Sequence, residues 1–224
     1  MGLLKDFTGA IQSDGYIVYE HFEGMEGKKL LGCWAHARRK FFEAKVENEK
    51  LALEALFYIR RLYDVEAEAD ALDAADNKPD HERRKALRQE KAYPEIKKFE
   101  TWMEASILKC PPKSLMEEAI SYTYKILKKL SLYVTDGRYK IDNNMVENSI
   151  RPLAIGRKNY LFCGDDDAAQ RAAVVYSLLA TCKARGVNER AWLEDVLRRI
   201  PEYEQAGKDY ADLLPANWRA LSAK

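Results

Sequence analysis

Short apolar segments near the N-terminus predict two β-strands. Residues 8–14 (TGAIQSD) are typical of a strand that ends at Asp14, and residues 28–34 (KKLLGCW) are typical of a second strand. A short helix is expected between them, over residues 16–22. From Ala35 onward the apolar residues recur at helical spacing, which predicts that the chain changes there from strand to helix.

The following hundred residues show helical spacing and no convincing strand pattern. One long helix is expected to end before residues 77–80, because Pro79 disfavours helix at the preceding residue. A charge-rich helical segment covers residues 81–108 and stops before a pair of prolines, and a third long helix is expected over residues 116–130. Residues 45–135 are therefore predicted to be helical throughout.

Capping signals predict two helices after a turn near residue 136. Asp142 is a suitable N-cap for a helix that carries Glu147, and Pro152 is expected to end or bend this helix. A second helix is expected to begin at the acidic residues 165–167 and to end near Gly186.

The last part of the chain predicts one more helix and a packed tail. Asn188 is expected to cap a helix that runs to Pro201. The tail is expected to pack its large apolar side chains onto the body of the protein: Leu213, Leu214 and Trp218.

The composition is that of a globular protein without a membrane segment. Of the 224 residues, 47% are hydrophobic and 33% are charged, and no apolar run reaches the length of about 18 residues that predicts a membrane span. The cysteines at positions 33, 110, 163 and 182 form no CxxC pair, which favours a reduced cytoplasmic setting. The net charge of +1 disfavours a DNA-coating protein, so any DNA contact has to come from local basic patches.

Two acidic residues are candidates for chemistry. Asp14 closes a strand, where acids often reach into a cleft, but Asp-Gly is also a common turn, and the residues alone favour the turn. Glu147 lies four residues from Asn143 and from Arg151, so all three share one helix face, which is either functional or merely solvated. Apolar residues off this face are expected to anchor the helix in the core: Val146, Ile150 and Leu153.

Cys33 and His36 are two potential soft metal ligands. A structural zinc site needs four ligands, and no second pair is present, so zinc is not expected. The ordinary alternative is a core cysteine beside a hydrogen-bonded histidine.

Several cations and aromatic residues suit contacts with nucleic acid. Tyr160 and Phe162 could stack on a base, although packing in the core is the favoured interpretation for both. Lysine and arginine contacts to phosphate give affinity without sequence specificity, and for each cation surface solubility is the alternative. The best candidates for such contacts are Arg38, Arg39, Arg157 and Lys158.

Three segments resemble bacterial transposases of the insertion sequence 66 family, which belongs to the DDE transposases. Residues 142–162 (DNNMVENSIRPLAIGRKNYLF) closely resemble the C-terminal signature of the family. Residues 11–19 (IQSDGYIVY) are similar to the segment around its second catalytic acid, and residues 32–44 (GCWAHARRKFFEA) resemble the block that follows. The resemblance covers nearly the whole chain and is weakest over 45–135; one departure is Asn148, where many members carry Arg.

The resemblance implies that Asp14 and Glu147 are the second and third acids of a site that holds two Mg²⁺ ions on DNA. It also implies that His36 contacts the scissile phosphate or stabilises the site. The residues that it would place on DNA are Arg38, Arg39, Asn143, Asn144, Arg151, Arg157 and Lys158. The implied partners are transposon ends and target DNA, other transposase protomers and accessory proteins of the same element, at the nucleoid of the bacterial cytoplasm and without a membrane.

The implied fold is mainly α with a small β part, the C-terminal portion of a ribonuclease-H-like α/β catalytic core interrupted by an all-helical insertion. Residues 1–44 would form the partial core with the Asp14 strand, and residues 45–135 the insertion. Residues 136–186 would add the core helices with Glu147, and residues 187–224 a C-terminal helical region.

The first acid of the family is not found, because only thirteen residues precede Asp14 and Asp6 is too close to lie on a separate strand. Two carboxylates should bind Mg²⁺ weakly, so we expect a truncated transposase that alone neither cleaves nor joins DNA. The alternatives are a non-enzymatic remnant that binds DNA or the full transposase as a competitor or regulator, and a helical interaction protein without a DNA role. Salt-dependent DNA binding would separate these two alternatives.

Overall fold

The computed structural model describes residue 4 and residues 6–218 of the chain. Contacts divide the chain into two compact units, the first up to Met145 and the second from Val146 onward. The described residues are mainly helical with one small sheet, which confirms the predicted mainly α class. The ribonuclease-H-like arrangement and the four-part domain division stay predictions. No helix in the described part of the chain is long and apolar enough to cross a membrane.

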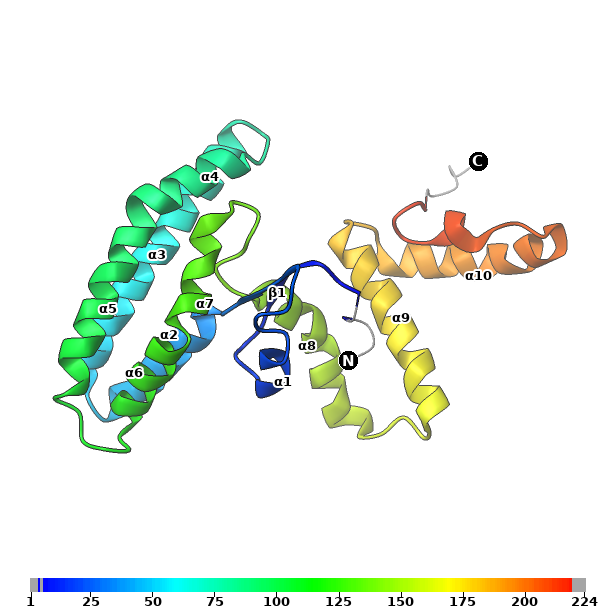
Figure 1. Ribbon diagram of the computed structural model, residues 1–224. Coiled ribbons are helices and arrows are strands. Elements are labelled where there is room, and N and C mark those ends of the chain that lie inside the picture. Colours follow the sequence, from blue (N-terminus) through cyan, green and yellow to red (C-terminus); the bar gives the residue numbers. More distant parts are fainter. Residues whose placement is uncertain (1–3, 5, 219–224) are drawn as a thin grey trace. The chain divides into compact units, whose positions relative to one another are not determined.

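The first unit contains a two-stranded parallel sheet (Figure 1). Strand β1 (Gly9–Gln12) pairs with β2 (Lys28–Leu31), with Ile11 opposite Leu30. The short helix α1 (Ile17–Glu20) follows β1 in the sequence. Both expected strands and the expected helix are therefore confirmed, although each strand is shorter than predicted.

The second strand ends at Leu31 and does not extend to Trp34. Trp34 instead begins helix α2 (Trp34–Glu43), and its backbone N–H donates to the Ile141 carbonyl at 3.2 Å. Beyond Leu31 the backbone therefore bonds with a distant segment and leaves the sheet, a change that the apolar pattern of residues 28–34 does not reveal.

Helices α2 to α7 pack as a bundle in the first unit (Figure 1). After α2 come α3 (Glu49–Ala75), α4 (His81–Leu87), a π-helical turn (Arg88–Ala92), α5 (Tyr93–Ile107), α6 (Leu115–Lys125) and α7 (Leu127–Ser131), with 3-10 turns at Ala44–Val46 and Leu132–Thr135. Asn48, Asp80 and Ser114 cap α3, α4 and α6 through their side chains. The single helix expected over residues 116–130 is wrong, because the chain breaks at Ile126 between α6 and α7.

Aromatic side chains form the centre of the bundle. Trp34 and Phe41 of α2 are fully buried, as is Phe99 of α5, and the Phe41 and Phe99 ring centroids lie 5.7 Å apart. The Trp34 indole N–H donates to the Leu130 carbonyl at 3.0 Å, so the buried polar atom is satisfied. This core fixes α2, which begins at the end of the sheet, against α5 and α7.

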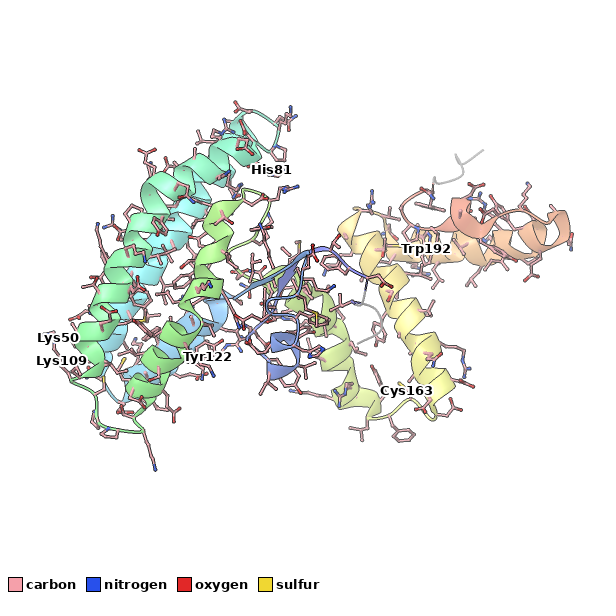
Figure 2. The ribbon with its side chains drawn as sticks, in the orientation of Figure 1. Lys50, His81, Lys109, Tyr122, Cys163 and Trp192 are labelled. Atoms are coloured by element: carbon pink, nitrogen blue, oxygen red, sulfur yellow. The ribbon has the colours of Figure 1, made fainter. Side chains whose placement is uncertain are left out.

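The described part of the second unit contains the α-helices α8 (Asn144–Tyr160), which begins just before the unit boundary, α9 (Asp166–Ala184) and α10 (Glu189–Ala206), and a 3-10 turn at Tyr210–Leu213. Asp165 and Asn188 cap α9 and α10 by accepting backbone N–H groups, as the sequence predicts. Trp192 (Figure 2) packs with Val196 and Leu213, and its indole N–H donates to the Leu213 carbonyl at 2.9 Å.

Several expectations for this second unit are wrong. Pro201 does not end α10, which continues to Ala206. Of the two outcomes expected at Pro152, an end or a bend of the helix, the end does not occur, because α8 continues to Tyr160. An interior proline removes one backbone hydrogen bond without forcing a stop when the flanking turns remain bonded. Leu213 and Trp218 of the tail pack against the helices of the second unit, as expected, but Leu214 is exposed. The expected core anchors of α8 are also exposed: Val146, Ile150 and Leu153.

Candidate functional site

Asp14 lies in a turn directly after β1. Its carboxylate oxygen Oδ1 accepts the backbone N–H of Tyr16 at 3.0 Å, and Gly15 has a φ of +88°, which an L side chain rarely adopts. The Asp14 carbonyl accepts the Tyr122 hydroxyl at 2.7 Å. Asp14 is nevertheless exposed. The turn and the accessible acid, which the sequence presents as alternatives, thus occur together.

The carboxyl ends of both strands meet the segment that leads to α8. The Gln12 side-chain amide donates to the Gly32 carbonyl at 3.1 Å and to the Lys140 carbonyl at 2.9 Å. The Ser13 N–H donates to the Leu31 carbonyl at 3.1 Å, which continues the pairing just past β1. Side chains at this end of a parallel sheet are well placed to form a site.

Asp142 lies at the same end of the first unit. Its carboxylate accepts the Tyr63 hydroxyl at 2.8 Å and both the backbone N–H and the side-chain amide of Asn144, at 3.1 and 3.0 Å. Because α8 begins at Asn144, the N-cap position is Asn143, one residue later than predicted. The Asp142 carboxylate still satisfies the first N–H of the helix.

Burial and the two neighbouring acids raise the pKa values of two tyrosine hydroxyls. Burial, and then the hydrogen bond and charge of Asp142, raise the pKa of Tyr63 far above its ordinary value. Burial and the charge of Asp14 raise the pKa of Tyr122 to about 12. Both hydroxyls therefore stay protonated at neutral pH and act as donors.

Helix α2 carries the next group of predicted site residues. Cys33, at its N-cap, is fully buried, and burial raises the pKa of its thiol. His36 is half-buried in the first turn, and Arg38 and Arg39 are exposed. The raised thiol pKa fits a structural core cysteine, because a reactive thiol needs a lowered pKa.

The remaining predicted residues lie on α8 or directly before it. Glu147 is half-buried in the first turn, where the helix dipole favours an acid. Arg151, Arg157 and Lys158 are exposed and form no ion pair within the part of the chain that the structure describes. Asn143 is half-buried and Asn144 exposed. Arg151 and Lys158 share the face of Glu147, because they follow it at helical spacing.

The end of α8 packs against α9 through its polar and small residues. The Tyr160 and Tyr176 hydroxyls lie 3.3 Å apart, and this hydrogen bond raises the pKa of Tyr160 to about 12. A Cβ on Gly156 would lie 2.8 Å from the Tyr160 ring, so the glycine allows this close approach. Core packing of Phe162 is a wrong prediction, since its side chain is 78% exposed, and Tyr160 is also exposed.

The structure thus gathers Asp14, Cys33, Asp142 and Asn143 at one end of the first unit, whereas Glu147 and three of the cations lie in the second. Among the described residues no three His, Cys, Asp or Glu side chains are grouped so as to hold a metal ion. Asp14 and Glu147 each offer the hard oxygen ligands that Mg²⁺ prefers.

Sequence reasoning missed the two tyrosines that contact the acid-bearing segments. Neither Tyr63 nor Tyr122 stands out in the sequence, because each lies in a helical segment with no motif around it. Their partners lie 79 and 108 residues away, so no local pattern signals either contact.

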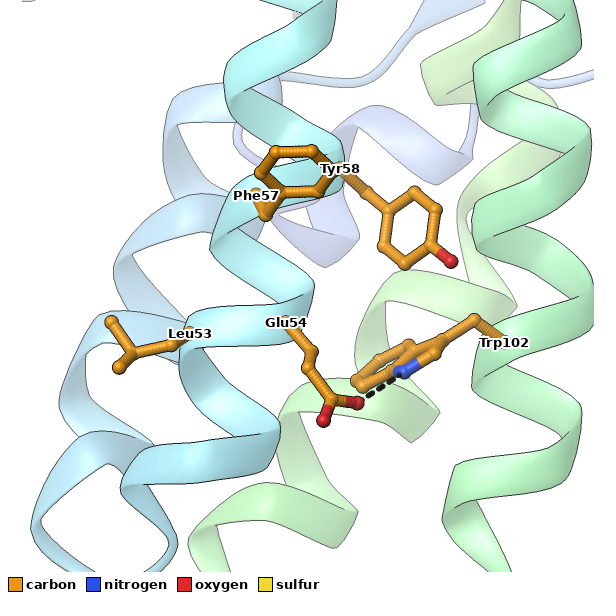
Figure 3. A pocket seen from close by; sticks show the side chains of 5 residues that line it. All are labelled: Leu53, Glu54, Phe57, Tyr58 and Trp102. Carbon is orange, nitrogen blue, oxygen red and sulfur yellow. Dashed lines mark hydrogen bonds between the residues drawn. The ribbon is translucent and has the colours of Figure 1, made fainter.

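A shallow pocket of about 430 Å³ lies on the outer side of α3 and α5 (Figure 3). It is lined by Leu53, Glu54, Phe57, Tyr58 and Trp102, and the Trp102 indole N–H donates to Glu54 at 2.9 Å. None of the predicted site residues lines it, so it is separate from the strand-end site.

Comparison with known proteins assigns the family of this chain. The model described as "Transposase IS66 family" matches residues 1–171, and that described as "IS66 C-terminal element" matches residues 177–216. The chain belongs to the IS66 transposase family, which confirms the resemblance seen in its motifs. Transposases of the DDE type generally use divalent metal ions.

Similar proteins from Sinorhizobium fredii (strain NBRC 101917 / NGR234) cover almost all of the chain. The uncharacterized protein y4qI is 36% identical over 225 residues, which cover 96% of this chain and 40% of y4qI. The uncharacterized protein y4hP is 32% identical over 237 residues, which cover 98% of this chain and 41% of y4hP. The chain thus spans well under half the length of these relatives. No solved structure matches it.

Proposed function

We propose that this chain takes part in DNA transposition by metal-dependent strand cleavage and strand transfer, and that Asp14 and Glu147 are metal ligands of that reaction. The observation that carries the proposal is the match of the transposase family to residues 1–171, which include both acids. Carboxylates suit this role because Mg²⁺ prefers hard oxygen ligands.

The surroundings of Asp14 support its role. The acid is exposed in a turn at the carboxyl end of a parallel strand, and backbone and side-chain hydrogen bonds fix the turn. A ligand that is already fixed loses little freedom when it binds a metal ion. A solvated loop with no other purpose would not need the contact from Tyr122.

The cations next to both acids support binding of DNA. We propose that exposed basic and amide side chains contact phosphates, and that His36 contacts the scissile phosphate or stabilises the site. Exposed cations that form no ion pair within the described residues can offer their full charge to phosphate. The proposed DNA-contact residues are Arg38, Arg39, Asn143, Asn144, Arg151, Arg157 and Lys158.

The proposed fold is a ribonuclease-H-like core with residues 45–135 as its helical insertion. The parallel pairing of β1 and β2, with the Asp14 turn at its end, supports this core. The proposed partners are transposon ends, target DNA, other transposase protomers and accessory proteins of the same element, in the bacterial cytoplasm at the nucleoid.

We also propose that this chain is catalytically incomplete by itself, since the motifs that it shares with the family supply two acids, Asp14 and Glu147. In a nicking assay with supercoiled DNA and Mg²⁺ or Mn²⁺, the chain alone should show no turnover. Metal-dependent nicking that is lost in Glu147→Gln would contradict this part of the proposal.

The metal-ligand roles are tested by transposition of a marked element by the transposase whose sequence includes this chain. Asp14→Asn and Glu147→Gln should each lower the frequency by about 10³-fold or more, because a metal ion contributes several kcal/mol to the transition state. Asp212→Asn and Glu43→Gln, at exposed acids away from both segments, are matched controls and should leave it unchanged. Near-normal transposition by either acid variant would refute its role.

A second candidate function is a non-enzymatic remnant that binds DNA or the transposase and acts as a competitor or regulator. The observation that favours it is the combination of exposed cations on α8 with an ungrouped set of acids. In this case the chain should bind DNA with a steep salt dependence and reduce transposition when it is co-expressed. Salt-independent or undetectable DNA binding would argue against both candidates.

A further inference from the structure

The helical bundle of the first unit contacts each acid-bearing segment through a tyrosine hydroxyl. Tyr122 of α6 donates to the Asp14 carbonyl at 2.7 Å, and Tyr63 of α3 donates to Asp142 Oδ2 at 2.8 Å. Asp142 directly precedes the helix that carries Glu147. Both contacts therefore connect residues of the predicted insertion to segments that the proposed function uses.

The Tyr122 contact completes the fixation of the Asp14 turn. The hydroxyl holds the Asp14 carbonyl, while the Tyr16 N–H holds its carboxylate at 3.0 Å. A Cβ on Gly15 would lie 3.2 Å from the Tyr122 hydroxyl oxygen, so the turn packs tightly on this side chain. The Lys40 ammonium of α2 lies 4.9 Å from the centroid of the Tyr122 ring and makes a cation–π contact with its face.

The Tyr63 contact fixes the start of α8. The Asp142 carboxylate joins Tyr63 to the backbone N–H and the side-chain amide of Asn144, which is the first residue of the helix. Hydrogen bonds to a carboxylate are stronger than those between neutral groups. Glu147 follows in the first turn of α8.

A fully buried arginine holds the chain just before Asp142. The Arg88 guanidinium donates to both carboxylate oxygens of Glu66 at 2.7 and 2.6 Å. It also donates to three carbonyls of the returning segment, those of Tyr133, Asp136 and Tyr139, at 2.9, 2.8 and 3.0 Å. All five N–H groups of this side chain are thereby used. The segment 133–139, which leads to Asp142, is thus hydrogen-bonded to the π-helical turn between α4 and α5.

We propose that Tyr63 and Tyr122 are positioning residues, through which the helical bundle sets the geometry of the α8 start and of the Asp14 turn. The inference rests on the proposed function for its catalytic consequence, but its structural content stands on the contacts alone. It gives the helical segment a role that neither its length nor its composition indicates.

Hydrogen exchange on the purified chain tests the structural content directly. The N–H groups of Tyr16 and Asn144, which bond to Asp14 and Asp142, are the reporters. Tyr63→Phe should speed exchange at Asn144 about tenfold, and Tyr122→Phe should speed it at Tyr16 about fivefold. Tyr124→Phe is the matched control, because its hydroxyl is also hydrogen-bonded on α6, but to Glu104.

The outcome separates positioning from a general contribution to stability. Local acceleration with unchanged exchange in the cores of α3 and α5 supports the proposal. Unchanged reporters overturn it, as does a uniform acceleration that includes α3 and α5. After Asp142→Asn, the further change Tyr63→Phe should have a smaller effect on Asn144 exchange than in the wild type, and equal effects in both backgrounds would contradict the assigned partner.

The catalytic consequence is tested by single-turnover strand cleavage with the transposase whose sequence includes this chain. Tyr63→Phe and Tyr122→Phe should lower the rate of cleavage about tenfold and leave DNA affinity unchanged, while Tyr124→Phe changes neither. Weaker DNA binding with a normal rate, or normal values of both, would overturn the positioning role. If Asp14→Asn and Glu147→Gln retain activity, the proposed function fails, whereas the exchange experiment still decides the positioning of the two segments.

Discussion

Arg88→Met should be among the most destabilising substitutions in the first unit. The guanidinium is fully buried and donates to Glu66 and to three backbone carbonyls. Breaking a buried ion pair by removing one partner costs about 3–5 kcal/mol, because the other charge remains buried. Arg84 also contacts Glu66 at 3.1 Å and offsets part of that loss, but the carbonyls lose their donors as well. We therefore expect a loss of about 4 kcal/mol in the free energy of unfolding.

The assay is urea unfolding of the chain, followed by far-UV circular dichroism and by exchange of the buried amides of α3. In thermal unfolding, a loss of about 4 kcal/mol corresponds to a fall in Tm of roughly 8–16 °C for a chain of this size. Arg61→Met is the matched control, since Arg61 pairs with Glu95 at 3.0 Å but is about half exposed. Such a pair should contribute about 0–1 kcal/mol.

The double variant Arg88→Met, Glu66→Met separates charge burial from packing. Removing both partners should recover part of the stability lost in Arg88→Met, because no unpaired charge is left in the interior. The reasoning would be refuted if Arg88→Met cost no more than Arg61→Met, or if the double variant were as unstable as the sum of the single ones.

Three further predictions concern the turn, the alkaline limit and DNA binding. Gly15→Ala should destabilise the first unit by about 1–2 kcal/mol in thermal unfolding, more than Gly24→Ala, which shares a positive φ but meets nothing within 4 Å; equal losses would show that the Tyr122 contact is irrelevant. Because the pKa of Tyr122 is raised to about 12 from 10, its contribution to stability is fully present below pH 10 and is lost as the pH rises to 12; Tyr122→Phe should flatten this alkaline loss, and an unchanged pH profile would contradict the assignment. Arg157→Ala and Lys158→Ala should each reduce the slope of log K against log salt for DNA binding by about one, with no change in sequence preference, and slopes equal to that of the wild type would exclude phosphate contacts.

Local signals in the sequence predict much of the fold. Asp165 and Asn188 cap their helices, and Gly186 has a φ of +66° just beyond α9, since capping depends only on neighbouring residues. Prediction from neighbouring residues fails where contacts with more distant residues decide the local structure. Pro152 lies inside α8, although a proline disfavours the helical conformation at the residue before it.

Most of the candidate site cannot be derived from local patterns. Only the resemblance of residues 11–19 to the family singles out Asp14 as a proposed site residue, and its side chain is exposed. The contacts that fix it and Asp142 come from Tyr122 and Tyr63, which are distant in the sequence and look like ordinary helical residues. Hydrogen bonds of this kind depend on the packing of the bundle, and packing follows from the whole chain and not from any window of it.

The hydrogen bond between the Trp34 N–H and the Ile141 carbonyl has a consequence for how this family can diversify. The chain leaves the sheet region at Trp34 and returns to the same point at Ile141, so the bundle between them is an excursion with adjacent ends. Insertions or deletions at the far tip, near Asn77, leave those ends untouched and cost little closure entropy. Changes near Tyr63 or Tyr122 would alter the acid-bearing segments. Natural length variation should therefore concentrate at the tip and spare the base of the bundle.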